Sequence, residues 1–200
     1  MKTLLQINTS VFSGQGNSTR LADAFVRNWL ERHPDSRVIV RDLAAEPIPH
    51  LDAAGVQAFF TKPEDRTPGQ QAFAAASEAL IEELRSADVV VIGLPMYNFG
   101  IPSTLKAYFD QLARAGISFR YTENGPEGLL GDRKVYVLAA RGGKYQGTPQ
   151  DTQTPFVQTF LNFIGIRDVE FVYAEGLNMG DEARDAAMAA ATTQIASLAA

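Results

Sequence analysis

The sequence of 200 residues contains no cysteine. Disulfide bonds, thiolate catalysis and cysteine-ligated metal centres are therefore excluded. Histidine is nearly as scarce, since only His33 and His50 occur, and both fall in expected connecting segments. No histidines or carboxylates stand at metal-ligand spacing, and no Gly-x-Ser-x-Gly stretch is present. We therefore expect neither a metal site nor an α/β-hydrolase.

Basic clusters and long apolar runs are missing as well. Lys and Arg number 18 against 23 Asp and Glu, which gives a formal net charge of -5. A nucleic-acid surface is not expected, because no stripe of Lys and Arg could neutralise phosphates. No apolar run reaches the roughly 18 residues of a membrane span. The apolar start of the chain is too short for a signal peptide, so we expect a cytoplasmic protein with no membrane partner.

What the chain does contain is a regular alternation of strand-like and helix-like patterns, which predicts a single domain over residues 1–200. Residues 43–70, punctuated by four prolines, are expected to form a long ordered excursion. Five strands alternating with five helices predict an α/β fold, a doubly wound five-stranded parallel sheet with helices on both faces. The expected strands are 3–8, 37–41, 87–94, 134–140 and 169–174, and the expected helices begin near 18, 70, 103, 155 and 181.

A ligand is expected beyond the carboxyl ends of the strands, at the point where strand order reverses. The loop of residues 9–18 leaves the first strand and contains Ser10, Gly16 and Ser18. Free backbone N–H groups and the helix dipole favour an anion at the start of the next helix. Thr19 stands where a dinucleotide fingerprint needs its last glycine, so one phosphate of a mononucleotide fits better than a pyrophosphate. The alternative is an ordinary turn in which Ser18 caps the helix.

Two further strand-end loops have unusual compositions. Residues 95–102 carry two aromatic rings, an amide and a glycine between two prolines. Such exposed rings favour a planar heteroaromatic ligand, although they could also pack on one another. Residues 141–145 carry paired glycines whose N–H groups could face a ring carbonyl, beside a cation that would favour negative charge on a reduced ring. By itself, the third loop is also compatible with a plain turn.

Together these loops resemble the FMN-dependent NADH:azoreductase and quinone reductase family, which has a flavodoxin-like fold. The strongest matches are Pro-Met-Tyr-Asn-Phe at 95–99 and Phe-Arg-Tyr-Thr-Glu-Asn-Gly-Pro-Glu-Gly at 119–128, with support from 141–143 and 160–165. The resemblance implies one FMN per subunit. It assigns the FMN phosphate to Ser10, Gly16, Asn17 and Ser18. It assigns the ribityl chain and the ring edge to Pro95, Met96, Tyr97, Asn98 and Phe99. It assigns the pyrimidine end of the ring to Ala140, Arg141, Gly142 and Gly143.

The resemblance also implies a homodimer with active sites at the subunit interface. Substrate contacts are expected from Phe60, Phe99, Tyr121 and Phe163, with Tyr121 and Phe163 offered by the neighbouring subunit. The implied reaction is a ping-pong transfer of a hydride from NADH or NADPH, through the flavin, to quinones or aromatic azo compounds. The flavin carries this chemistry, so no side chain is an obligatory acid or base and Tyr121 is at most an assisting group.

Two other functions remain open at this stage. A flavodoxin-type electron carrier would exchange single electrons with protein partners, and a free-flavin reductase would use FMN as a diffusible substrate. The modest net charge and the aromatic-rich segments at 43–70 and 116–130 favour a covered substrate slot over an electron carrier. No short motif distinguishes NADH from NADPH, and the physiological electron acceptor is not indicated.

Overall fold

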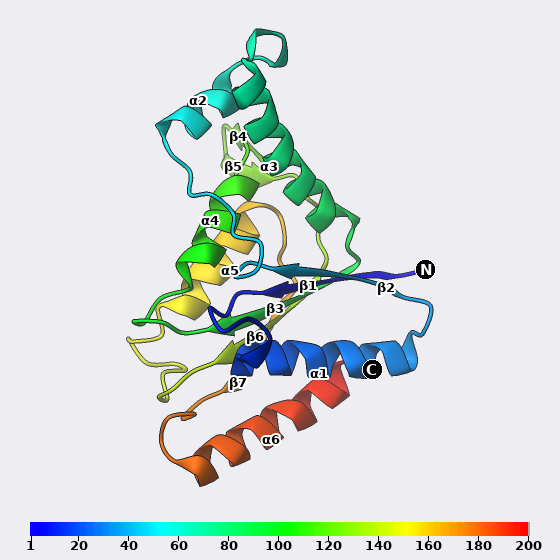
Figure 1. Ribbon diagram of the computed structural model, residues 1–200, viewed down its shortest axis with the longest axis vertical. Coiled ribbons are helices and arrows are strands. Elements are labelled where there is room, and N and C mark those ends of the chain that lie inside the picture. The colour runs from blue at the N-terminus through cyan, green and yellow to red at the C-terminus, as the bar shows by residue number, and fades with distance from the viewer. Residues whose placement is uncertain (200) are drawn as a thin grey trace.

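The computed structural model describes residues 1–199, and at its centre is a five-stranded parallel sheet (Figure 1). The strand order is β2-β1-β3-β6-β7, so the order reverses between β1 and β3. In chain order the strands are β1 (Thr3–Asn8), β2 (Arg37–Asp42), β3 (Val89–Pro95), β6 (Lys134–Ala140) and β7 (Val169–Ala174). The expected doubly wound α/β fold is confirmed.

Helices cover both faces of this sheet (Figure 1). On one face lie α1 (Asn17–Arg32) and α6 (Asp181–Leu198), whose core includes Phe25 and Trp29. On the other lie α3 (Pro68–Ser86), α4 (Ser103–Leu112) and α5 (Gln153–Phe163), around Tyr108 and Phe109. Every residue of β3 is buried, because helices pack on both of its faces, as its continuous apolar run predicts.

Two regions of the chain contain elements that the sequence did not predict. The excursion at 43–70 contains a sixth helix, α2 (Ala53–Phe60), and a short 3₁₀ turn at Pro63–Asp65, where no helix was expected. Asp52 caps α2 by accepting a hydrogen bond of 2.7 Å from the N–H of Gly55. The segment 116–130 contains an antiparallel hairpin of β4 (Phe119–Thr122) and β5 (Gly125–Gly128).

The ends of the sheet position the loops that matter for function. Because all five strands are parallel, the loops that follow β1, β3, β6 and β7 emerge at the same edge. Gly93 in β3 allows the first turn of α1 to approach closely, since a Cβ there would lie 2.9 Å from the carbonyl oxygen of Ser18. Within residues 1–199, no helix is both long enough and apolar enough to cross a membrane.

Candidate functional site

The loop after β1 forms a small cradle at the start of α1. Ser10 lies at its base, where its Oγ accepts the N–H of Phe12 at 3.2 Å. Gly16 packs directly on Ser10, because a Cβ at residue 16 would lie 2.2 Å from that oxygen. The helix begins at Asn17 with Gly16 as its N-cap and no side-chain cap, so the alternative in which Ser18 caps the helix is wrong.

Two buried hydroxyl groups in the first turn of α1 lack a partner. Ser18 Oγ and Thr19 Oγ1 are shielded from solvent, and neither makes a hydrogen bond within the described residues. A buried polar group without a partner is costly, and such groups are uncommon in folded proteins. The first turn also carries no acidic side chain. The hydroxyls and the free N–H groups of this turn thus form a set of uncharged donors suited to an anion.

The loop after β3 contains a tight turn with unusual backbone geometry. Tyr97 and Gly100 exchange two backbone hydrogen bonds, of 3.1 and 2.9 Å. The two residues between them have positive φ angles, 50° at Asn98 and 63° at Phe99. Positive φ at both central residues is the mark of a type I′ turn, which suits Asn but strains a bulky residue such as Phe. Strain of this kind is typical of functional sites.

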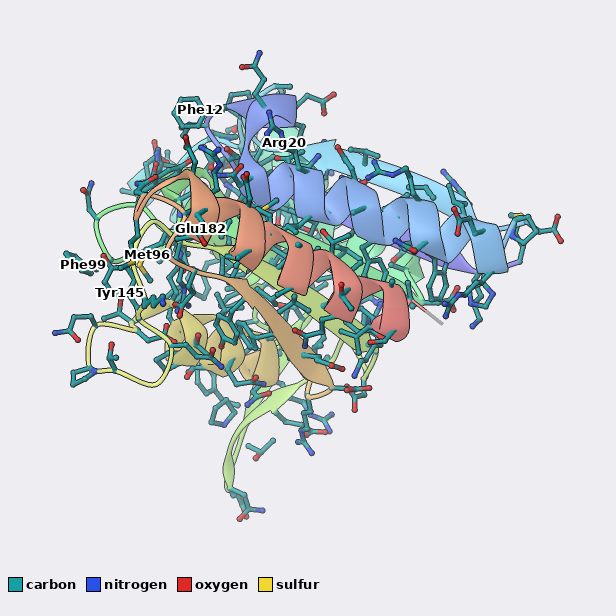
Figure 2. The ribbon with its side chains drawn as sticks, turned by 90° about the horizontal axis from the view of Figure 1, so that it is seen from below. Phe12, Arg20, Met96, Phe99, Tyr145 and Glu182 are labelled. Atoms are coloured by element: carbon teal, nitrogen blue, oxygen red, sulfur yellow. The ribbon has the colours of Figure 1, made fainter. Side chains whose placement is uncertain are left out.

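Tyr97 joins this turn to the cradle. Its hydroxyl lies 3.3 Å from Ser10 Oγ and also accepts the N–H of Val11 at 3.3 Å. The loops after β1 and β3 therefore form one continuous surface. In Figure 2, Phe12 of the loop after β1 lies at the same end of the molecule as Met96, Phe99 and Tyr145.

Next to the turn lies a cavity of about 460 Å³, formed by the loops after β3, β6 and β7. Phe99 and Tyr145 meet edge to face, with ring centroids 5.6 Å apart, and Phe99 stays half exposed. Phe99 thus packs on Tyr145 only in part and leaves an aromatic surface open. The cavity is lined by Met96, Asn98, Phe99, Gly142, Gly143, Tyr145 and Asn178.

Side chains of the site lie close to the paired glycines after β6. A Cβ at Gly142 would lie 2.6 Å from Asn178 Nδ2, and one at Gly143 would lie 2.6 Å from the Tyr145 hydroxyl. Within residues 1–199 the N–H groups of both glycines make no hydrogen bond. They therefore remain available to the carbonyl oxygens of a ligand. Asn178 and Tyr145 were not predicted as site residues, although Asn178 follows β7 and the ends of parallel strands are where ligands bind.

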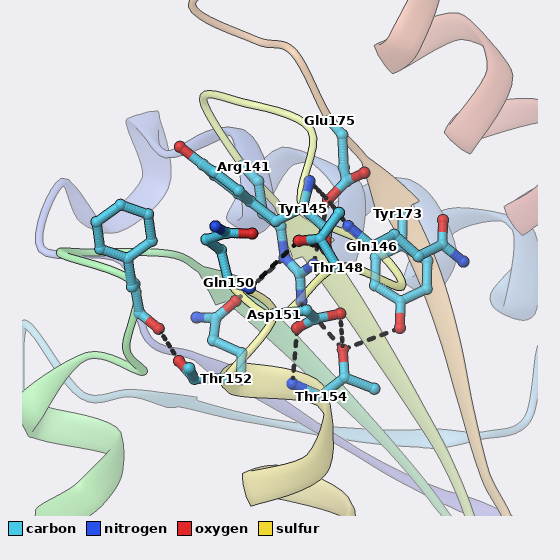
Figure 3. A network of polar contacts seen from close by, with 12 residues as sticks. Arg141, Tyr145, Gln146, Thr148, Gln150, Asp151, Thr152, Thr154, Tyr173 and Glu175 are labelled. Carbon is cyan, nitrogen blue, oxygen red and sulfur yellow. Dashed lines mark hydrogen bonds and ion pairs between the residues drawn. The ribbon is translucent and has the colours of Figure 1, made fainter.

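Arg141 does not provide the cation expected beside the ligand. Its guanidinium is fully buried between two carboxylates, with Nη2 2.8 Å from Asp151 and Nη1 3.1 Å from Glu175 (Figure 3). Burial alone would raise the pKa of the Asp151 carboxyl, but hydrogen bonds from Arg141 and Thr154 outweigh burial and hold that pKa below its usual value. The charge of Arg141 is neutralised by these partners, so any contact with a ligand falls to its backbone.

The expected substrate residues are spread over the surface. Phe60 ends α2 with 78% of its surface exposed, and Tyr121 on β4 is 77% exposed. Phe163 is half-buried at the end of α5 and contacts Phe119, with ring centroids 4.3 Å apart. Of the expected substrate residues, only Phe99 lines the cavity of its own chain. In residues 1–199, no group of three or more His, Asp or Glu side chains could hold a metal ion.

The arrangement defines a class of protein. An uncharged anion cradle at a helix start lies beside an aromatic cavity with free N–H groups, at the switch point of a doubly wound sheet. These features fit a mononucleotide with a flat heteroaromatic base. A family model described as flavodoxin-like fold matches residues 1–199, and the chain belongs to this family.

Curated and solved relatives extend this assignment. An "FMN-dependent NADH:quinone oxidoreductase" of Cellvibrio japonicus (strain Ueda107) is 55% identical over 195 residues, which are 98% of this chain and 97% of the relative. The solved azoreductase from Bacillus anthracis str. Sterne has a TM-score of 0.91 and 31% identity, covering 100% of this chain and 99% of its own. An FMN-dependent NADH-azoreductase from Bacillus anthracis str. Ames Ancestor, solved in complex with FMN, has a TM-score of 0.88 and 27% identity, covering 100% of both chains.

Proposed function

We propose that this protein is an FMN-dependent NADH:quinone oxidoreductase that also cleaves aromatic azo compounds reductively. One observation carries the proposal: the buried, unpartnered hydroxyls of Ser18 and Thr19 lie in the cradle that Tyr97 joins to the aromatic cavity. A phosphate would satisfy the hydroxyls, and the flat ring of the same molecule would cover the exposed face of Phe99. The names of the relatives described above identify FMN and NADH as the matching molecules.

Residues from three loops would hold the FMN. The phosphate would lie among Ser10, Gly16, Asn17 and Ser18, with Thr19 as a further hydroxyl donor. Main-chain groups of Gly142 and Gly143, together with the amide of Asn178, would bind the pyrimidine edge of the ring. The ribityl chain and the ring edge would lie along the loop of Pro95, Met96, Tyr97, Asn98 and Phe99, and Ala140 and Arg141 would contribute backbone.

When bound, FMN supplies the two-electron chemistry, because it can accept a hydride from NADH and pass it to a quinone or azo compound. The protein contributes orientation and a partly dry surface. Tyr145 is the one titratable side chain among the residues that line the cavity, so we assign no obligatory acid or base. Protons for the reduced product would come from water.

We also propose that two chains form a homodimer with a substrate slot at the interface. Phe60 and Tyr121 are large and exposed, and neither contributes to the cavity of its own chain. A second cavity of about 440 Å³ has Gly100, Ile101 and Phe156 in its wall, and Gly100 directly follows Phe99 of the first cavity in the chain. Exposed apolar surface of this kind is typical of subunit interfaces. We assign Phe60, Tyr121 and Phe163 to the slot of the neighbouring subunit.

The proposed function is tested by spectroscopy and turnover. The purified protein should show oxidised flavin bands, or gain them when incubated with FMN, and anaerobic NADH should bleach them. Addition of menadione should restore the bands without any further protein. A preparation that remains colourless with excess FMN would refute the proposal.

Two results would favour the alternatives. Failure of NADH to bleach the flavin unless a separate reductase is present would identify an electron carrier. Consumption of added FMN as a diffusible substrate, with release of its reduced form, would identify a free-flavin reductase. We further propose a cytoplasmic location, because NADH is a metabolite of that compartment; cell fractionation tests this.

A further inference from the structure

The segment from Asp151 to Thr154, which leads into α5, contacts two of the loops that line the cavity. Thr152 Oγ1 donates a hydrogen bond to the carbonyl oxygen of Phe99. Gln153 is fully buried, and its Nε2 donates to the carbonyl oxygens of Pro95 at 2.7 Å and Gly100 at 3.0 Å. A single amide group therefore holds both ends of the strained turn after β3.

The same side chain connects to the loop after β6. Gln153 Oε1 accepts Arg141 Nε at 3.3 Å. Arg141 continues to Glu175, whose Oε1 also accepts the N–H groups of Tyr145 and Gln146, each at 2.9 Å. Figure 3 shows Arg141 between Asp151 and Glu175, with the 145–148 turn beside them. Both polar atoms of the Gln153 side-chain amide thus have partners. The resulting series of hydrogen bonds connects the loop after β3 with the loop after β6, and both loops line the cavity.

The turn after β3 needs such support because of its backbone geometry. Asn98 and Phe99 have positive φ angles, and Phe99 is a residue for which this conformation is unfavourable. Strained backbone persists only where its surroundings over-determine it. Without the two hydrogen bonds from Gln153, the turn can relax to other conformations. The apparent affinity for a ligand that needs the strained form falls in proportion to the population of that form.

We propose that Gln153 is a positioning residue for the flavin. Its amide holds the 95–100 turn in the conformation that binds FMN, and its bond to Arg141 couples that turn to the loop of Gly142 and Gly143. The role is one of geometry rather than charge, because Gln153 is neutral and Arg141 is paired with two carboxylates. The inference rests on the FMN binding of the proposed function.

The test compares FMN affinity with the stability of the apoprotein. Gln153→Glu keeps the size of the side chain and its acceptor for Arg141, but turns a carboxylate toward the two carbonyl oxygens that lost their donor. We expect the FMN Kd, from fluorescence titration of apoprotein, to rise about tenfold, because the unsatisfied carbonyl groups lower the population of the strained form that binds FMN. The visible circular dichroism of the bound flavin should also change. Thr152→Val, which removes only the bond to Phe99, should raise the Kd by roughly threefold.

The matched control is Gln158→Ala on the same helix, where the amide donates only to Asn162 Oδ1. It should leave the FMN Kd and the flavin spectrum unchanged. Unchanged FMN affinity in both Gln153→Glu and Thr152→Val would overturn the inference. So would a loss of apoprotein stability in Gln153→Glu with an unchanged Kd for the folded fraction, which would make Gln153 merely structural. If wild-type apoprotein itself fails to bind FMN, the proposed function fails rather than this inference.

Discussion

The hydroxyl group of Ser18 contributes differently to the stability of the apoprotein and to that of the protein with a bound anion. It is buried without a partner in the described residues, so it costs stability when no ligand is bound. An unsatisfied buried polar group costs about 1–3 kcal/mol, whereas a hydrogen bond to a charged group contributes roughly 1.5–3 kcal/mol. The side chain is therefore better suited to binding an anion than to stabilising the fold.

Ser18→Ala should separate these two effects. We expect the apoprotein to melt at the same or a higher temperature, because an unpartnered polar group has been removed. The FMN Kd should rise by at least about tenfold, since a bond to the phosphate is lost. Differential scanning fluorimetry and fluorescence titration measure the two quantities, with Ser86→Ala at the exposed end of α3 as the control. An unchanged Kd would remove Ser18 from the phosphate site.

Asp42 ties the cradle loop to the end of β2. Its carboxylate accepts the hydroxyl of Ser13 and the N–H groups of Ala44 and Ala45. Burial raises the pKa of Asp42, but these hydrogen bonds outweigh burial and leave the pKa below its usual value. A depressed pKa in the folded state gives stability that is present above the unfolded pKa of about 3.9 and is lost as the pH falls through the folded value.

Asp42→Asn should therefore remove part of the acid sensitivity of the apoprotein. At pH 7 the variant should unfold at a lower urea concentration than the wild type. The difference should shrink as the pH falls below about 4 toward the lower folded-state pKa, because the unfolded wild-type chain binds a proton at Asp42 first and the ionised carboxylate then loses its advantage. Urea midpoints measured across this range decide the point. A gap that stays constant with pH would mean that the ionised carboxylate is not the source of the stability.

At the scale of elements, helices and strands could be predicted where the residues that determine them lie within one short stretch of sequence. The strands 3–8, 134–140 and 169–174 were predicted with their observed bounds, because each is a short apolar run. Helix α2 was missed because prolines surround it, although Asp52 is a residue typical of an N-cap. The hairpin of β4 and β5 was missed because Gly125–Gly128 has the composition of a turn, despite the Asn124-Gly125 signal.

The candidate site likewise has one part that could be predicted from the sequence and one part that could not. The cradle and the 95–100 turn lie within continuous stretches, so their compositions were informative from the sequence. The interaction of Arg141 with Glu175, and the approach of Asn178 to Gly142, join residues on different loops. Only the strand order brings those loops together. The burial of Arg141 between two carboxylates could therefore not be predicted from the composition of residues 141–145.

Helix α2 depends on side-chain contacts rather than on a buried apolar face. Only Gly55 and Ala58 of this helix are buried. Arg66 Nε donates to the carbonyl oxygens of Ala58 and Thr61 at 3.2 and 3.1 Å, which satisfies the carboxyl end of the helix. Arg114 stacks on Phe59, with its guanidinium 3.9 Å from the ring centroid. These contacts hold the segment that presents Phe60.

Arg66→Gln should loosen α2 without affecting flavin binding. We expect faster proteolytic cleavage within residues 53–66, because the carbonyl groups at the helix end lose their donor. The KM for menadione should rise if Phe60 contributes to the substrate slot, while the FMN Kd should stay unchanged. Arg184→Ala on α6, where the half-exposed side chain pairs with Asp181 and Asp185, is the control. A raised FMN Kd in Arg66→Gln would show that the segment supports the cofactor instead.

At the scale of the whole molecule, the two faces of the sheet have different surroundings. Helices α1 and α6 pack against each other on one face. On the other face, the excursion and the hairpin present Phe60 and Tyr121 to solvent, although the cavity of the same chain does not use them. In a symmetric dimer, each chain would offer its cradle to one site and its exposed rings to the other.

Mixed dimers test whether the cradle and the exposed rings of one site come from different chains. Ser18→Asp places a negative charge at the helix start, where it suits the helix dipole but repels a phosphate, so this chain should fold without FMN. A second chain carries Phe60→Ala and Tyr121→Ala, and should bind FMN but reduce menadione poorly. When the two are unfolded and refolded together with FMN, half of the dimers should be mixed, and each mixed dimer has one intact site.

Equal mixing should therefore recover about one quarter of the wild-type menadione reductase activity, more than either parent alone. Sites built within one chain would instead give the mean of the two parents, because no mixing could bring an intact cradle to intact rings. Refolding each variant separately and combining the products controls for refolding losses, and activity should then rise only as subunits exchange. A mixture that stays at the parental mean, with native mass spectrometry showing mixed dimers, would place Phe60 and Tyr121 outside the neighbouring site.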